Sequence, residues 1–184
     1  TMKKKLLTAI FVFSLWGNMQ AQDAPHGYPY SPVPFTSVKV TDSFWGQRLK
    51  ASREVTIPLA FSKCEESGRY ENFVKAAHPS ENYKVEGLPF DDTDVYKTIE
   101  GASYLLQTYP DKKLKSYIDS VLAIVAAAQE PDGYLYTSRT MNPKHPHAWS
   151  GSRRWEKVED LSHEFYNLGH MVAVSYTHLR AHET

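Results

Sequence analysis

The chain has 184 residues, and its 21 basic and 21 acidic side chains leave a formal net charge of zero. No net field therefore points to nucleic acid or to an anionic membrane surface as a partner. The hydrophobic fraction of 41% excludes an intrinsically disordered chain. Aromatic residues reach 13% of the chain, and their flat faces suit sugar rings and thick helical cores equally well.

The N-terminus has the pattern of a secretory signal peptide over residues 1–22. Three lysines at residues 3–5 precede an apolar run at residues 6–16, and small and polar residues follow. The apolar run is too short to span a bilayer core of roughly 30 Å as a helix. We therefore expect cleavage near Ala21 or Gln22, a periplasmic or secreted protein, and no membrane partner after cleavage.

Cys64 is the only cysteine of the chain. No intramolecular disulfide and no metal site built from several cysteines can therefore form within it. The apolar, helical context of Cys64 favours a small buried hydrophobe over a reactive thiol.

The first segments after the signal peptide predict an extended lead-in and then a helix. Four prolines keep residues 23–41 extended, and the alternation at residues 35–40 predicts one short strand. Asp42 and Ser43 form an N-cap signal for the helix, which Pro58 interrupts or kinks.

A helical hairpin is predicted in the middle of the chain, after a long loop at residues 68–91 that lacks periodicity. The first helix follows the acidic residues 91–94 and ends at Pro110. Its buried stripe consists of Val95, Ile99, Ala102 and Leu106. The second helix covers residues 113–129, with a stripe of Leu114, Tyr117, Ile118, Val121, Leu122 and Val125. Because only Pro110 and Asp111 join these helices, they are expected to run antiparallel.

The remaining segments favour loops and one more helix. A turn at residues 131–133 leads to a brief extended segment at 134–137 and a long loop at 138–158. A last helix is expected from near Leu161 through Met171. No repeat of solenoid length recurs. The prediction is therefore an all-α fold with long loops and one or two short strands, arranged as an α/α toroid with its loops at one mouth.

Residues 162–170, Ser-His-Glu-Phe-Tyr-Asn-Leu-Gly-His, form the first candidate site. A zinc-protease helix needs a second histidine four residues after the first, but that position is Asn167. His163 and His170 are about 10.5 Å apart along a helix axis, which is too far to share one ion. The face that they form with Tyr166 and Asn167 suits a hydroxyl-rich ligand. A solvated polar face or a satisfied core histidine is the alternative.

Two weaker candidate sites lie before residues 162–170 in the chain. Residues 91–94 carry three carboxylates that could hold a hard cation or act in acid/base chemistry, although capping of the helix N-terminus is the favoured interpretation. Tyr134, beside the turn at 131–133, could line a sugar subsite.

Four strings in order resemble the β-L-arabinofuranosidases of glycoside hydrolase family 127 and the related family 146. They are Phe44-Trp45, residues 90–97, Ala128-Gln129 with residues 132–135, and residues 162–170. The resemblance covers residues 35 to about 172. It implies the N-terminal part of an (α/α)6-barrel catalytic domain, followed in the family by β-sandwich domains.

The resemblance also implies an activity and its parts. Family members remove terminal β-L-arabinofuranosyl units from plant-type glycans or glycoproteins, with retention of configuration. They use a cysteine nucleophile held on zinc with other cysteines and a glutamate, and a second glutamate as acid/base. Those residues lie downstream of the Ser-His-Glu string. We therefore expect no catalytic residue in this chain and no zinc bound by it.

The expected contact with an arabinose-containing glycan rests on a few side chains. His163 matches a family histidine that hydrogen-bonds the bound arabinofuranose. The substrate-binding candidates are His163, Tyr166, His170, Asp94 and Tyr96.

The end of the chain departs from the family pattern. Residues 42–173 correspond to a partial catalytic domain, whereas residues 174–184 lack an amphipathic stripe and look like translated adapter sequence. We therefore expect a truncated, chimeric reading frame that is inactive alone, marginally stable and prone to aggregate. A non-catalytic secreted sugar-binding module and another α/α-toroid enzyme, such as a lyase or a glucuronyl hydrolase, remain as alternatives.

Overall fold

The computed structural model describes residues 30 and 32–182. These residues fall into two compact units, one ending at Val38 and the other beginning at Lys39. The predicted signal peptide lies outside the described residues, and so do residues 23–29 and 31 of the proline-rich lead-in.

The described part of the first unit holds one short 3-10 helix, η1 (Phe35–Ser37). The prediction of a strand at residues 35–40 is wrong. The Ser37 N–H donates to the Pro34 carbonyl at 2.9 Å, and the Val38 N–H donates to the Phe35 carbonyl at 3.0 Å. These local bonds satisfy the backbone groups that a strand would need to pair with a neighbour.

The second unit is built from helices and loops, and none of its described residues forms a strand. The all-α prediction is confirmed for the described part of the chain, and the one or two predicted strands are not formed there. Its elements are α2 (Ser43–Ala51), η2 (Ser52–Thr56), α3 (Ile57–Glu66), α4 (Arg69–Ala77), α5 (Asp92–Thr108), α6 (Lys112–Ala127), α7 (Thr137–Thr140), η3 (Ala148–Ser150) and α8 (Glu164–His182).

Helix α2 begins where the sequence predicts, because the Asp42 carboxylate accepts from the Trp45 N–H at 2.7 Å. The chain then passes through the π-helical turn η2 and continues directly into α3. Pro58 is the second residue of α3, directly after the π-helical turn, and it lacks the N–H that would bond to a carbonyl of that turn. The proline therefore coincides with a change of helix type rather than with a gap in the helix.

Helix α4 lies inside the segment predicted to be a loop, so the prediction for residues 68–91 is wrong over its first half. Gly68 adopts φ +75°, which few other residues tolerate, and α4 starts immediately after it. Phe73 and Ala76 are buried on its inner side. The Asn72 amide donates to the Glu86 carbonyl at 2.9 Å and accepts from the Glu86 N–H at 2.8 Å, which attaches the following loop to the helix.

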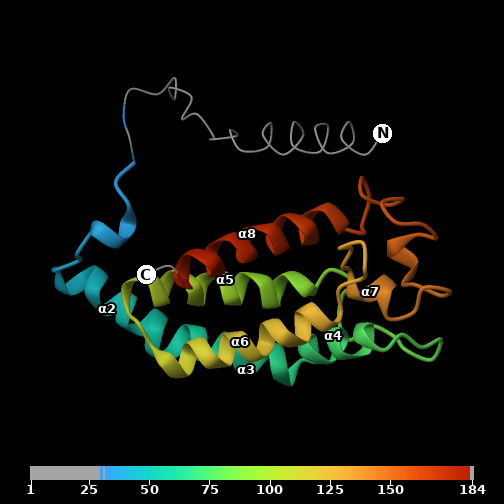
Figure 1. The fold of residues 1–184 in the computed structure, drawn as a ribbon, viewed down its shortest axis with the longest axis horizontal. Coiled ribbons are helices and arrows are strands. Elements are labelled where there is room, and N and C mark those ends of the chain that lie inside the picture. The colour runs from blue at the N-terminus through green and yellow to red at the C-terminus, as the bar shows by residue number, and fades with distance from the viewer. Residues whose placement is uncertain (1–29, 31, 183–184) are drawn as a thin grey trace, which may run out of the picture. The chain divides into compact units, whose positions relative to one another are not determined.

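The helical hairpin of α5 and α6 agrees with the prediction. Helix α6 starts beside the end of α5 and runs back in the opposite direction (Figure 1). The Asp111 carboxylate caps α6 by accepting from the N–H groups of Lys113 and Leu114. The predicted stripe of α5 is buried along its whole length: Val95, Ile99, Ala102 and Leu106.

Helix α8 lies along α5 and completes the core (Figure 1). It begins at Glu164 rather than near Leu161 and continues past Met171 to His182. Val174 and Thr177 are buried, although residues 174–184 show no stripe in the sequence. The non-native origin of that tail stays a prediction.

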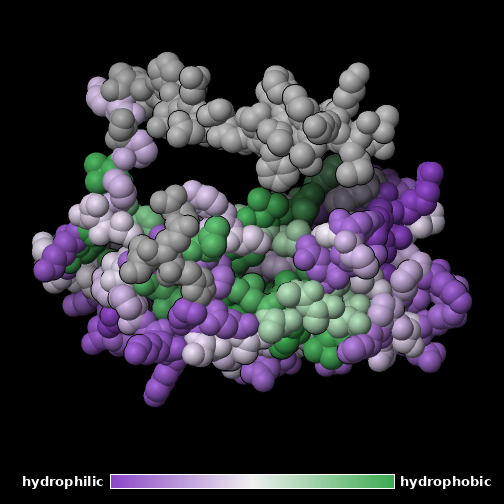
Figure 2. Space-filling model, in the orientation of Figure 1, coloured by the Kyte–Doolittle hydropathy of each residue, from purple (hydrophilic) through white to green (hydrophobic). Residues whose placement is uncertain are grey.

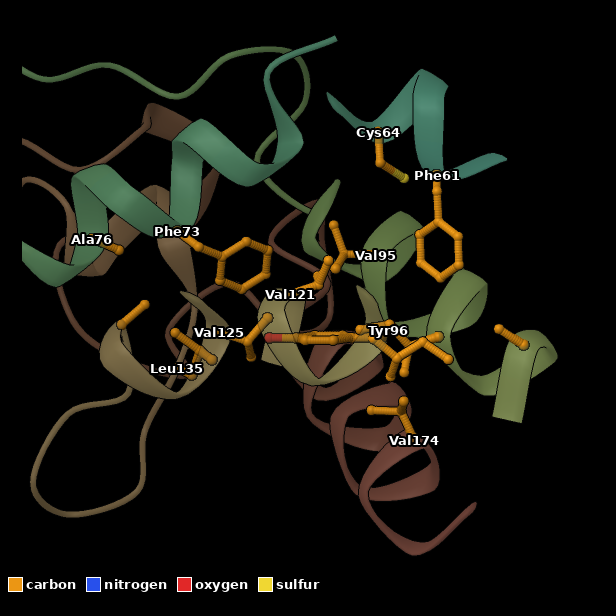
Figure 3. Packing of buried hydrophobic residues seen from close by; sticks show 14 of the residues in the cluster. Phe61, Cys64, Phe73, Ala76, Val95, Tyr96, Val121, Val125, Leu135 and Val174 are labelled. Carbon is orange, nitrogen blue, oxygen red and sulfur yellow. The ribbon is translucent and has the colours of Figure 1, made fainter. Parts of the chain in front are cut away.

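The core of the second unit is a single apolar cluster to which α3, α4, α5, α6 and α8 contribute (Figure 3). Phe73 and Tyr96 meet edge to face, with ring centroids 5.8 Å apart. Cys64 is 5% exposed and belongs to this cluster, so its interpretation as a buried small hydrophobe is confirmed. Burial raises the pKa of its thiol, which disfavours the reactive thiolate.

Candidate functional site

A hollow of about 440 Å³ opens where the first turns of α5 and α8 meet. Its lining residues are Phe90, Asp91, Thr93, Asp94, Lys97, His163 and Tyr166. The structure thus brings together three of the five predicted site residues, namely Asp94, His163 and Tyr166. The wall of the hollow is formed by loop residues 90–91 together with residues at the starts of α5 and α8.

His163 stands at the N-terminus of α8 in the left-handed backbone region, with φ +55°. Its carbonyl accepts from the backbone N–H of Asn167 at 2.9 Å and from the Asn167 side-chain amide at 3.0 Å. Its ring packs on Phe90, with centroids 4.4 Å apart. Such strained backbone persists only where its surroundings hold it, and it is often found at functional sites.

The imidazole of His163 also has a defined orientation. Its Nδ1 lies 2.9 Å from the Leu161 carbonyl oxygen. A carbonyl can only accept, so Nδ1 carries the proton, and in the neutral ring Nε2 is an unprotonated acceptor.

The loop before His163 is held by buried aromatic residues. The Tyr136 hydroxyl donates to the Ser162 carbonyl. The buried Glu164 carboxylate accepts from the Tyr134 hydroxyl at 2.6 Å and from the backbone N–H of Trp155 at 3.0 Å. Burial, and then the hydrogen bond to Glu164, raise the pKa of the Tyr134 phenol, so it remains a neutral donor. Tyr134 was predicted to line a sugar subsite, whereas it lies behind the hollow and supports it.

The acidic residues at the start of α5 have separate roles. Asp91 occupies the N-cap position, but its carboxylate does not accept a hydrogen bond from the first turn of the helix. Its carboxylate accepts from the Leu88 N–H at 2.7 Å and pairs with Arg69 at 2.7 Å, whereas no side-chain bond caps the helix. Asp94 faces the hollow and pairs with Arg69 at 3.3 Å. The favoured capping interpretation is therefore corrected, although Asp94 still lies in the first turn, near the positive end of the helix dipole.

Asp92 points the other way, into the protein. It accepts from the backbone N–H of Thr137 at 2.9 Å and from the Thr137 hydroxyl. Burial raises its pKa to about 6 in spite of these hydrogen bonds. It therefore connects α5 to α7 and offers no group to the hollow.

The two other predicted site residues lie outside the lining. Tyr96 is 1% exposed in the core, because it follows Asp92 by four residues on the buried side of α5. Its expected substrate contact is therefore corrected to a packing role. His170 lies one further turn along α8, edge-on to Tyr166 with centroids 4.6 Å apart. It contacts a wall residue and does not itself line the hollow.

A second hollow of about 420 Å³ adjoins the first. Its lining residues are Ala60, Lys63, Cys64, Ser67, Arg69, Asp94, Lys97 and Thr98. Asp94 and Lys97 belong to both hollows. Lys97 holds its ammonium 4.7 Å from the centroid of the Tyr166 ring, in a cation–π contact.

Sequence reasoning missed Phe90, Lys97 and Glu164 as parts of this site. Phe90 and Lys97 stand within the string Phe-Asp-Asp-Thr-Asp-Val-Tyr-Lys, one turn from Asp94, so helical spacing alone offered a signal for Lys97. Glu164 gives no such signal, because its partners lie in loops distant in the sequence.

The described residues do not fit a resident zinc ion. Among residues 30 and 32–182, no three His, Cys, Asp or Glu side chains lie close enough together to hold a metal ion. Within the described part of the chain, the Cys64 thiol lies 3.9 Å from the Thr98 hydroxyl and has no second cysteine or histidine beside it that could share a metal ion. In the same described part, no helix is long and apolar enough to cross a membrane.

Comparisons with known proteins converge on one family. The family model described as beta-L-arabinofuranosidase, GH127 catalytic domain, matches residues 37–184. The non-reducing end beta-L-arabinofuranosidase of Bifidobacterium longum subsp. longum is 29% identical over 167 residues, which cover 80% of this chain and 25% of that protein.

Two solved structures that resemble this chain belong to the same family. The GH127 beta-arabinofuranosidase BT3674 matches with a TM-score of 0.84 and 78% identity, over 88% of this chain and 25% of its own. Ara127N-Se, a GH127 beta-L-arabinofuranosidase from Geobacillus stearothermophilus T6, matches with a TM-score of 0.69 and 31% identity, over 79% and 23% respectively.

The chain spans about a quarter of the length of these relatives. The matched region nevertheless includes both hollows and every residue that lines them. The chain therefore belongs to the GH127 β-L-arabinofuranosidase family of glycoside hydrolases and carries part of its catalytic domain.

Proposed function

We propose that this chain forms part of a secreted, retaining exo-glycosidase that removes β-L-arabinofuranosyl units from plant-type glycans or glycoproteins. Within that enzyme it supplies one wall of the sugar pocket. The observation that carries the proposal is the hollow of His163, Asp94 and Tyr166, in a chain that is 78% identical to a GH127 beta-arabinofuranosidase.

The chemistry of the wall suits a furanose ring with several hydroxyl groups. Asp94 and the Nε2 atom of His163 are acceptors for sugar hydroxyls. Phe90 and Tyr166 add aromatic surface for the apolar edges of the ring. The support behind His163 keeps its imidazole in one orientation, so little ordering remains to be done when a ligand binds.

The chain is proposed to bind without cleaving. In the family a zinc-held cysteine acts as nucleophile, and the described residues offer no set of ligands for that ion. No reaction step is therefore assigned to this chain. We propose further that its helices are part of an (α/α)6 barrel, which the similarity to GH127 structures supports.

The test is to purify the 184-residue chain and titrate it with methyl β-L-arabinofuranoside, using NMR to follow binding. We expect weak binding and no release of arabinose from an aryl β-L-arabinofuranoside. His163→Ala should abolish binding, while His78→Ala, at an exposed position after α4, should not. Thermal melts of both variants establish that they are folded.

Two outcomes would contradict the proposal. A folded chain that binds no arabinofuranoside would remove the sugar-pocket assignment. Release of arabinose by this chain would overturn the proposed division between binding and cleavage. The alternative of a sugar-binding module that works without a catalytic part is favoured if the chain binds other furanosides and pyranosides equally well.

A further inference from the structure

Lys97 is a cation without a carboxylate partner at the centre of the site. Among the described residues, no Asp or Glu oxygen lies within ion-pairing distance of its ammonium, although Asp94 lines the same two hollows. Asp94 is instead paired with Arg69. The only interaction recorded for the Lys97 ammonium in this part of the chain is with the face of Tyr166, 4.7 Å away.

Helix α5 sets the direction in which the Lys97 side chain points. Lys97 follows Thr93 by one turn of α5, so both side chains point to the same side as His163 and Tyr166. The Tyr166 ring, itself in contact with His163 and His170, gives the long lysine side chain a surface to rest on. All three hydrogens of the ammonium are left for ligand atoms.

The imidazole of His163 and the carboxylate of Asp94, which line the hollow together with Lys97, are acceptors. The Nδ1–H of His163 is engaged by the Leu161 carbonyl, so in the neutral ring its Nε2 can only accept. The Asp94 carboxylate also only accepts. A ligand that satisfied these two groups with hydroxyl protons would still need a donor for a ring or glycosidic oxygen, which has no proton to give. Two side chains of this lining can supply it, the Tyr166 hydroxyl and the Lys97 ammonium, and Lys97 is the one that carries a positive charge.

We propose that Lys97 is a ligand-contacting, specificity-determining residue of the hollow. It donates to a ligand oxygen that carries no proton, while Nε2 of His163 accepts from a ligand hydroxyl. The ligand class is a furanoside with a free hydroxyl beside its ring or glycosidic oxygen. This assignment rests on the proposed function, because it takes the hollow to be the sugar pocket.

The binding test compares the 184-residue chain with Lys97→Met and Lys97→Arg, using methyl β-L-arabinofuranoside as the probe. Lys97→Met keeps most of the length of the side chain and removes its donors, and we expect its affinity to fall about tenfold or more. Lys97→Arg retains donors and the cation–π contact, and should bind better than Lys97→Met.

Lys63→Met is the matched control. Lys63 is an exposed lysine of the adjoining hollow, but its ammonium pairs with Glu66 at 2.5 Å. We expect Lys63→Met to bind the probe as the wild-type chain does. Equal affinities for Lys97→Met and Lys63→Met would overturn the role of Lys97 and leave the sugar pocket intact. A folded wild-type chain that binds no probe would instead overturn the proposed function, and this inference with it.

A second measurement tests the role of His163 without any ligand. In a chain labelled with ¹⁵N at histidine, the His163 signals can be assigned by their loss in His163→Asn. The expected pattern at pH 8 is a protonated Nδ1 and an unprotonated Nε2. A proton on Nε2 would overturn the donor and acceptor pattern from which the role of Lys97 is inferred.

Discussion

At the scale of single residues, the site depends on one backbone angle. His163 adopts φ +55°, a conformation that costs an ordinary L-residue roughly 1–2 kcal/mol. The two hydrogen bonds from Asn167 to its carbonyl, and the bond from Tyr136 to the preceding carbonyl, oppose that cost. The protein therefore holds the imidazole over the hollow at the expense of local strain.

Glycine and alanine substitutions can measure this strain. We expect His163→Gly to be more stable than His163→Ala by about 1 kcal/mol, because glycine adopts the left-handed region without a steric cost. The matched pair is Lys115→Gly and Lys115→Ala inside α6, where glycine should be the less stable by a similar amount. Urea unfolding measures both differences. If alanine were the more stable at position 163 as well, the left-handed conformation would be wrong.

Asp92 makes stability depend on pH. Its pKa is raised from 3.8 to about 6, mainly by burial, so the folded state binds the proton more tightly than the unfolded chain. Its contribution is fully present below the unfolded pKa of about 3.9 and is lost as pH rises through about 6. A shift of this size corresponds to roughly 3 kcal/mol.

Asp92→Asn should therefore flatten the dependence of unfolding free energy on pH between pH 4 and pH 7. Its amide can still accept from the Thr137 N–H and can donate to the Thr137 hydroxyl oxygen. Denaturant unfolding at four pH values compares it with the wild type and with Asp160→Asn, at an exposed position. Identical slopes for Asp92→Asn and the wild type would refute the raised pKa.

At the scale of helices, the sequence predicted well what periodicity encodes. The stripes of α5 and α6 are long and regular, and the structure buries Val95, Ile99, Ile118 and Val121. Helix α4 was missed because it is short, and its buried side combines the apolar Phe73 and Ala76 with the polar Asn72. Tertiary contacts such as the paired amide of Asn72 stabilise it, and no local pattern contains them.

The site was predictable to the same extent. His163, Tyr166 and Asp94 stand in strings that resemble the family, and they do line one hollow. Which side of α5 faces the hollow and which faces the core was harder to predict. Tyr96 is a predicted site residue, but it faces the core. Glu164 stands in the same strings, but its supporting role could not be predicted, since it comes from Tyr134 and Trp155 in separate loops.

The N-cap of α6 offers a test at this scale. Asp111→Ala should lower the free energy of unfolding by about 1 kcal/mol, because the N–H groups of Lys113 and Leu114 lose their acceptor. Asp111→Ser retains an acceptor and should recover most of the loss. Lys112→Ala is the control at the next position, and urea unfolding is the measurement. An unchanged Asp111→Ala protein would show that α6 depends on packing alone.

At the scale of the second unit as a whole, helix α8 carries an exposed apolar stripe on its surface. Helix α8 buries one side against α5, but Phe165, Val172, Tyr176 and Leu179 on its other side are each more than half exposed. Their spacings of 7, 4 and 3 place them on one face. Figure 2 shows apolar surface gathered over the middle of the helices. Trp155 stacks on Phe165 at one end of this stripe, with ring centroids 5.0 Å apart, whereas Val172 and Leu179 are more than half exposed.

Exposed apolar stripes of this kind drive association in water. We therefore expect the chain to self-associate as its concentration rises, in line with the aggregation predicted from its sequence. Val172→Ser should weaken this association, because it places a polar group in the middle of the stripe without disturbing a buried contact. Leu88→Ser is the control, since Leu88 is an exposed leucine of a loop and does not belong to the stripe. Sedimentation velocity over a range of concentrations measures the effect. A wild-type chain that stays monomeric, or equal effects of the two substitutions, would show that the α8 stripe does not drive association.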